Sequence, residues 1–198
     1  MIASASQQEL LSEDHDLAAI DSTGLESRHV STYFGQRCGR KYRRYPKVSQ
    51  VVDTRSHLAL AAVVDRGPKP DDIEFHAAVR QAHARHRFAA LGGDVAYDGE
   101  RHHRFLNSLD VLGIIPPRRG RPSHDPDHRP GGFFRRFWHD HWDDVQHLYG
   151  QRWQAETRFS MEKRLLGSCL TARRRAAQDR EAYLRVLTLN LMLLGPDP

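Results

Sequence analysis

The chain has 198 residues, enough for one domain with a substantial hydrophobic core. Its net charge is +5, and only four of its 30 basic residues are lysine. Arginine binds phosphate through paired hydrogen bonds, so this composition favours a nucleic-acid partner, although a GC-rich genome also enriches arginine. The two cysteines, Cys38 and Cys169, form no ligand pattern, which fits a reducing compartment. No signal peptide is visible and the apolar run at 186–194 is too short to span a membrane, so no membrane partner is expected.

The first third of the chain predicts a tail, a strand and a hairpin. Residues 1–16 are polar and are expected to form a frayed tail. A short apolar run at 17–20 predicts a buried strand that ends at Asp21, where a turn follows. A polar, basic loop is expected at 25–46, and then a hairpin of two strands at 47–53 and 58–65.

The middle of the chain alternates helices with short strands. Two helices are expected, each begun by a capping aspartate: residues 73–86 after Asp71 or Asp72, and residues 99–112 after Asp98. Two short apolar runs, at 88–91 and 113–115, predict strands that follow or precede these helices.

The last third predicts a basic loop and two helices. The loop, rich in Pro, Gly and Arg, covers 116–136 and is interpreted as either DNA-facing or disordered. Helices are expected at 138–166 and 171–194. The order of elements predicts one α/β domain over 17–194, with an antiparallel start and parallel crossovers.

The helix expected at 138–166 carries a polar stripe beside an apolar one. At about 100° per residue, four polar side chains share an arc of about 60°: Tyr149, Arg152, Glu156 and Lys163. A core-facing stripe lies next to them: Leu148, Ala155, Phe159 and Leu166. The helix is therefore expected to lie against a polyanion, with the Glu156 carboxylate at the reaction centre. The alternative is that the polar stripe is simply a solvated face.

Three carboxylates are candidates for a metal site. Asp21 and Asp94 each follow a short apolar run, where sites gather in open α/β sheets, and Glu156 comes from the striped helix. Their hard oxygen ligands suit two Mg²⁺ or Mn²⁺ ions, which can activate water and stabilise the leaving oxygen of a phosphodiester. Asp53 and Asp65 are better explained as turn residues, and Asp98 as a helix cap.

These residues resemble the Y-R-E-K signature of insertion-sequence DDE transposases, with Tyr149, Arg152, Glu156 and Lys163 at the family's spacing. Three further segments agree with the family's two aspartate segments and its hairpin: residues 20–24, 48–57 and 93–100. The resemblance implies a ribonuclease-H-like mixed sheet flanked by helices. It also implies that Asp21, Asp94 and Glu156 bind the metals, and that the other three signature residues bind DNA.

The family mechanism is implied by the same resemblance. Water attacks to free a 3′-hydroxyl at the element end, and that hydroxyl then attacks double-stranded target DNA. The implied state is a homodimer on DNA in the bacterial cytoplasm, associated with the nucleoid when DNA is bound.

The sequence departs from the family at its N-terminus. Members usually carry a helical end-recognition region, whereas here 20 residues precede Asp21, so that region is expected to be lacking. Two alternatives therefore stay open: a catalytically silent remnant that binds DNA non-specifically, and a nuclease on the same fold.

Histidine and tryptophan give weaker signals. His102, His103, His139 and His141 lack the cysteine partners of a zinc site, and are interpreted as solvated or phosphate-facing. Trp138, Trp142 and Trp153 are interpreted mainly as core or helix-packing residues, with base stacking as the alternative.

Overall fold

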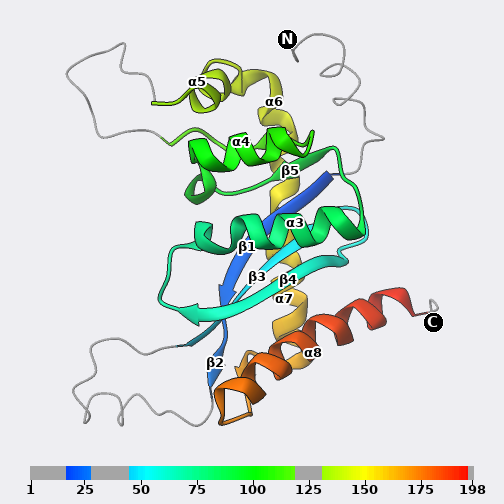
Figure 1. Ribbon diagram of the computed structural model, residues 1–198. Coiled ribbons are helices and arrows are strands. Elements are labelled where there is room, and N and C mark those ends of the chain that lie inside the picture. Colours follow the sequence, from blue (N-terminus) through cyan, green and yellow to red (C-terminus); the bar gives the residue numbers. More distant parts are fainter. Residues whose placement is uncertain (1–16, 28–44, 119–130, 196–198) are drawn as a thin grey trace.

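The computed structural model describes residues 17–27, 45–118 and 131–195 (Figure 1). The expected tail at 1–16, most of the basic loop at 25–46 and the centre of the loop at 116–136 lie outside the described residues. Within the described part no helix is long and apolar enough to cross a membrane.

A five-stranded mixed sheet forms the centre of the domain, with strand order β4-β3-β1-β5-β6. The strands are β1 (Leu17–Gly24), β3 (Tyr45–Asp53), β4 (Ala59–Gly67), β5 (Ala90–Gly92) and β6 (Leu112–Ile114). The β1–β3 and β3–β4 pairs are antiparallel, whereas β1–β5 and β5–β6 are parallel. This confirms the predicted hairpin, the parallel crossovers and a mixed sheet flanked by helices. A separate two-stranded parallel pair joins β2 (Glu26–Ser27) to β7 (Cys169–Leu170).

Helices cover both faces of the sheet (Figure 1). On one face, α3 (Phe75–Arg85) and α4 (Glu100–Ser108) bury an apolar core against Ile20, Val51 and Leu91. On the other face lie α5 (Phe133–Asp140), α6 (Trp142–Tyr149), α7 (Trp153–Leu166) and α8 (Arg175–Leu194). Alternate residues of β1 serve the two faces, because successive side chains of a strand point to opposite sides: Ala18 and Ile20 face α3, and Ala19 faces Ala155 of α7.

The predicted end of the first strand was wrong. β1 continues through Asp21 to Gly24, because β3 pairs with it as far as Gly24 opposite Lys47. Asp21 therefore lies inside the strand, directly opposite Gln50. The polar residues after the apolar run read as a turn in the sequence, but backbone pairing keeps them extended.

The single long helix expected at 138–166 is divided. It begins earlier, at Phe133 inside the predicted basic loop, and breaks at His141, whose φ is −115°. A 3-10 turn, η3 (Gly150–Arg152), then separates α6 from α7. The backbone of η3 keeps right-handed helical angles at Tyr149 and Trp153, so the axis continues through a tighter turn.

The predicted aspartate caps were also wrong. A 3-10 helix, η1 (Asp71–Glu74), precedes α3, and the residue before each α-helix, Glu74 for α3 and Gly99 for α4, makes no side-chain capping bond. The three aspartates are ion-paired instead. Asp71 pairs with Lys47 at 2.6 Å and Asp72 with Arg101 at 2.6 Å.

Candidate active site

Asp21 lies on the sheet face that α7 covers. Its register partner Gln50 contacts α7, and side chains opposite one another in an antiparallel pair share a face. Burial raises the pKa of Asp21 to about 6, even though the Arg152 guanidinium acts to lower it. The carboxylate of Glu156 adds to the rise. Asp21 is therefore a poorly hydrated carboxyl group with a cation and a second carboxylate in its electrostatic neighbourhood.

Asp94 follows β5, the strand that pairs with β1 in parallel. It begins a 3-10 turn, η2 (Val95–Tyr97), and its carboxylate accepts a hydrogen bond from the Val95 N–H at 2.6 Å. Gly92, two residues earlier, packs against η3, since a Cβ built there would lie 3.7 Å from the Cβ of Arg152. This close packing brings Arg152 to the end of β5. Although burial opposes it, Tyr149, Glu156 and, to the smallest extent, Asp94 raise the pKa of Arg152.

Glu156 forms an ion pair with Arg152 at 2.7 Å within the first turn of α7. The Glu156 side chain is 54% exposed, whereas that of Arg152 is 21% exposed. The Arg152 guanidinium also lies over the Tyr149 ring, 5.5 Å from its centroid. One guanidinium therefore pairs with the carboxylate of α7 and acts at longer range on those of β1 and of the end of β5.

The three carboxylates share this neighbourhood but do not converge on one point. Among the described residues, no group of three or more His, Cys, Asp or Glu side chains lies close enough together to hold a metal ion. The donor chemistry nevertheless fits a hard divalent cation, because the three are oxygen ligands that one guanidinium only partly neutralises. Glu156 is exposed enough to change rotamer, and would have to exchange Arg152 for the metal.

Lys163, the last residue of the predicted signature, lies near the other end of α7. Its ammonium group donates a hydrogen bond to the Thr23 hydroxyl at 2.8 Å. Thr23 is two residues beyond Asp21 on the same face of β1, so α7 runs along β1 from Glu156 to Lys163. The predicted polar stripe thus lies along the strand that carries Asp21.

A buried polar network beside this stripe was not predicted. Arg158 is fully buried and donates hydrogen bonds to Gln50 Oε1 at 2.9 Å, to the His57 carbonyl at 2.7 Å and to the Val186 carbonyl at 3.0 Å. Gln50 in turn donates to Glu162 Oε2 at 2.9 Å. The network joins α7 to β3, the β3–β4 turn and α8, and it holds the helix that carries Glu156. The one signal in the sequence was Gln50, a polar residue inside an apolar strand.

Asp98 belongs to a second cluster, formed with residues of α4 and α5. Its carboxylate pairs with Arg135 at 2.8 Å and His103 at 3.2 Å, and accepts from the Arg118 N–H at 2.8 Å. Although burial opposes it, these contacts hold the pKa of Asp98 well below its ordinary value. Arg135 binds this carboxylate through its side chain and Arg118 through its main-chain N–H, although both belong to the loop that was predicted to be DNA-facing or disordered.

The other competing carboxylates have structural partners. Asp53 accepts from the Ser56 N–H at 2.8 Å across the hairpin turn, which confirms the turn interpretation. Asp65 forms an ion pair with Lys69.

The prediction that the adjacent histidines are solvated was wrong, because His102 and His103 are both 2% exposed. Burial lowers the pKa of His102, whose Nδ1 lies 3.0 Å from the Tyr97 carbonyl. Trp138 packs in a core cluster with Ile114 and Val145, as expected, whereas Trp153 is 54% exposed.

The family follows from the sequence match, which covers most of the chain. A family model described as the transposase DDE domain matches residues 12–191. The chain belongs to this transposase family. The transposase domain is thereby a DNA-cleaving and strand-transfer enzyme of a family that uses divalent metal ions and acts on DNA.

Two solved structures are similar to the transposase domain. One is the catalytic core domain of BIV integrase, at 13% identity and a TM-score of 0.42, covering 89% of this chain and 84% of that one. The other is a chain of the simian T-cell lymphotropic virus intasome bound to a PP2A regulatory subunit, at 11% identity and a TM-score of 0.43. It covers 89% of this chain and 48% of that chain.

Proposed function

We propose that this transposase domain cleaves DNA at insertion-sequence ends and joins the freed 3′ end to target DNA, with Asp21, Asp94 and Glu156 as its metal ligands. The observation that carries the assignment is the shared electrostatic neighbourhood of these carboxylates around Arg152. Two Mg²⁺ or Mn²⁺ ions, when bound, would activate the attacking oxygen and stabilise the leaving oxygen.

Arg152 has two partners in this proposal. It forms an ion pair with Glu156 at 2.7 Å and opposes the rise in the pKa of Asp21. When a divalent cation takes over the carboxylates, the guanidinium is released and can bind a DNA phosphate through paired hydrogen bonds. Tyr149 stays beneath it as a stacking partner, and Lys163 supplies a second cation farther along α7.

The sites of action follow from this chemistry. The substrate is double-stranded DNA, both at the element ends and at the target, and a homodimer would hold two ends together. The corresponding location is the bacterial cytoplasm, at the nucleoid when the domain is bound to DNA.

The test is metal-dependent nicking of a DNA substrate by the purified full chain, followed by strand transfer of a pre-cut 3′ end. We expect nicking and joining with Mg²⁺ or Mn²⁺ and neither with EDTA. Asp94→Asn should lower the nicking rate at least 100-fold, since an amide cannot replace a carboxylate ligand. Asp144→Asn is the matched control on exposed α6 and should keep the wild-type rate.

The outcomes separate the alternatives. Nicking without strand transfer would indicate a nuclease on this fold. DNA binding without nicking under either metal would indicate a silent remnant and would refute the enzymatic assignment of this chain.

A further inference from the structure

The last helix, α8, has two apolar faces. One is buried against the sheet through Ala182, Val186 and Leu189. The other is exposed, with leucines spaced three, four and three residues apart: Leu184 at 60%, Leu187 at 53%, Leu191 at 61% and Leu194 at 66% exposure. At about 100° per residue the centres of the two faces are roughly 150° apart. Burial within the domain therefore does not account for the four leucines, which we call the leucine stripe.

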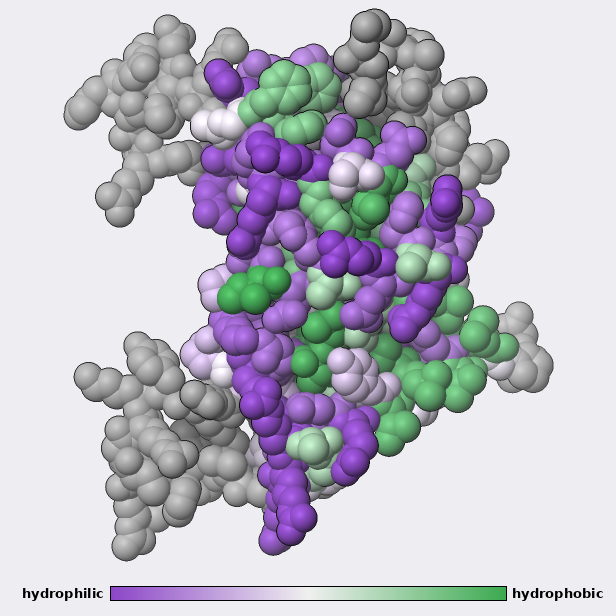
Figure 2. All heavy atoms as spheres, viewed as in Figure 1, coloured by the Kyte–Doolittle hydropathy of each residue, from purple (hydrophilic) through white to green (hydrophobic). Residues whose placement is uncertain are grey.

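The stripe lacks charge. The helix carries no ionisable residue from Val186 to Leu194, in a chain of which 28% is charged. Figure 2 shows hydrophobic atoms gathered over this end of α8. A surface without a cation is unsuited to DNA, and one without basic residues lacks the pattern of a membrane-surface helix. The 3-4-3 spacing of leucines is the repeat by which two helices pack side by side.

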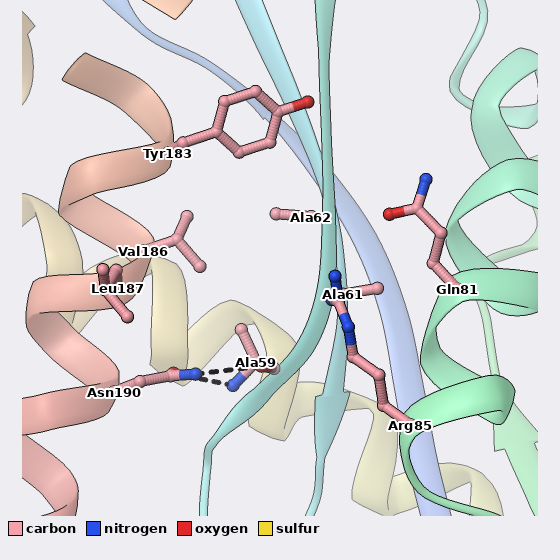
Figure 3. Close-up of a pocket in the computed structure, with 9 residues that line it drawn as sticks. All are labelled: Ala59, Ala61, Ala62, Gln81, Arg85, Tyr183, Val186, Leu187 and Asn190. Atoms are coloured by element: carbon pink, nitrogen blue, oxygen red, sulfur yellow. Dashed lines mark hydrogen bonds between the residues drawn. The ribbon is translucent and has the colours of Figure 1, made fainter. Parts of the chain in front are cut away.

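A groove next to the stripe offers room for an incoming side chain. It has a volume of about 480 Å³ and lies over the edge strand β4, with Tyr183 and Leu187 of α8 on one side, Gln81 and Arg85 of α3 on the other, and Ala61 and Ala62 of the strand between them (Figure 3). A large apolar side chain fits above such small residues. Leu187 belongs to both the stripe and the groove wall, so the two form one continuous surface.

Strand addition to β4 is not the way this surface would be used. Asn190 of α8 already donates to the Ala59 carbonyl at 3.0 Å and accepts from the Ala59 N–H at 3.0 Å. The Tyr183 hydroxyl accepts from the Val64 N–H at 3.3 Å. These side chains occupy backbone groups that a pairing strand would need. An occupant therefore has to pack by side chains, as a helix does.

We infer that the leucine stripe is a self-association surface, on which α8 of a second copy of this chain packs across a two-fold axis. A neutral stripe is self-complementary, since the same patch meets itself in a two-fold interface without opposing like charges. The exposed leucines and Tyr183 offer on the order of 100 Å² each, or roughly 1,000 Å² for two copies, which reaches the size of a specific interface. Because it needs neither metal nor DNA, the inference is independent of the proposed reaction.

The first experiment is sedimentation equilibrium of the nuclease-treated full chain at 1–100 µM in 0.5 M NaCl, where bridging by DNA is suppressed. The wild type should dimerise. The double variant Leu184→Glu with Leu191→Glu should weaken dimerisation at least 100-fold without unfolding, since both positions are exposed. Leu165→Glu is the matched control: this leucine of α7 is 57% exposed and lies outside the stripe, so its dimer should be unchanged.

A second experiment asks whether the two stripes face each other. The double variant Leu184→Lys with Leu191→Lys should also be monomeric alone. Mixing it with the Glu double variant should give a heterodimer, because lysines then face glutamates whether the two helices pack parallel or antiparallel. A wild type that stays monomeric at 100 µM overturns the inference, and amide protection on the outer face of α8 would then show that another segment of the chain covers it. An equal loss of dimer in Leu165→Glu, or no heterodimer on mixing, overturns it as well.

Discussion

Asp94 and Asp98 are four residues apart, yet they belong to different systems. Asp94 is partly exposed beside Arg152, whereas the Asp98 side chain is 3% exposed and paired with Arg135 and His103. Both follow the same short strand in the sequence, so their order along the chain does not separate them. The sequence already favoured a structural role for Asp98, as a helix cap, but only α4 and α5 show that this role is an ion pair with Arg135 and His103.

Substitution to asparagine should separate these roles by stability. Asp98→Asn leaves the partly buried Arg135 and the buried His103 without their carboxylate and should lower the free energy of unfolding by about 2–4 kcal/mol. Asp94→Asn should change it by less than about 0.5 kcal/mol, because asparagine begins a helical turn as well as aspartate does. Urea unfolding without metal measures both. A stable Asp98→Asn variant would contradict the structural role.

At Asp21, by contrast, substitution by asparagine is predicted to raise the free energy of unfolding, in a pH-dependent way. Its pKa is raised from 3.8 to about 6, so the folded state binds the proton more tightly and stability is lost as pH rises through this window. Asp21→Asn escapes that loss. At pH 7–8 without metal it should be more stable than wild type by about 1–2 kcal/mol, with little difference near pH 4.

Urea unfolding at several pH values tests this difference, with Asp144→Asn as the exposed control that should follow the wild type at every pH. A destabilised Asp21→Asn variant at pH 7 would mean that the Asp21 carboxylate is better solvated or better paired than its burial indicates.

At the scale of elements, α7 is the part that unites the site. Its exposed side carries Glu156, and its buried side carries Arg158 and Glu162. Both buried side chains form hydrogen bonds with Gln50 of β3. The ideal-helix projection placed the signature residues on one border correctly enough to pair Arg152 with Glu156. It could not show that η3 interrupts the helix, because the sequence there has no proline to mark a break.

Removal of the buried guanidinium should loosen this helix. Arg158→Met leaves the 2%-exposed Glu162 with a weaker set of partners and should cost about 3 kcal/mol or more of unfolding free energy. Arg164→Met is the matched change on the exposed side of α7 and should cost no more than about 0.5 kcal/mol. Urea unfolding compares the two. Equal effects would show that the network does not hold α7.

At the scale of the whole molecule, the basic charge should determine DNA binding only in part. Several arginines predicted to face DNA are bound to carboxylates within the domain, as Arg135 is to Asp98 and Arg152 to Glu156. A count of basic residues therefore overstates the phosphate contacts. Arg152 is paired with Glu156 in the structure, and metal binding to the carboxylates should free it.

Salt titration of DNA binding tests this linkage. Ca²⁺ is the metal of choice because carboxylates bind it in a more flexible geometry than they bind Mg²⁺. With Ca²⁺ present, Arg152→Ala should reduce the slope of log K against log salt by about 0.9. Without metal the reduction should be much smaller. Arg164→Ala is the neighbouring control. Equal reductions with and without metal would show that Glu156 does not hold Arg152 away from DNA.

The sequence by itself determined the hairpin, the parallel crossovers, the family and the residues proposed for the site. These depend on local hydrophobic period and on fixed spacing, both of which are visible along one chain. The tertiary structure decided which partners hold the structural carboxylates, which cation faces which anion, and that α8 presents a second apolar face. Those properties depend on partners far apart in sequence. Arg158 meets Gln50 only because strand register and helix packing bring them together. A local sequence pattern contains no information about such a contact.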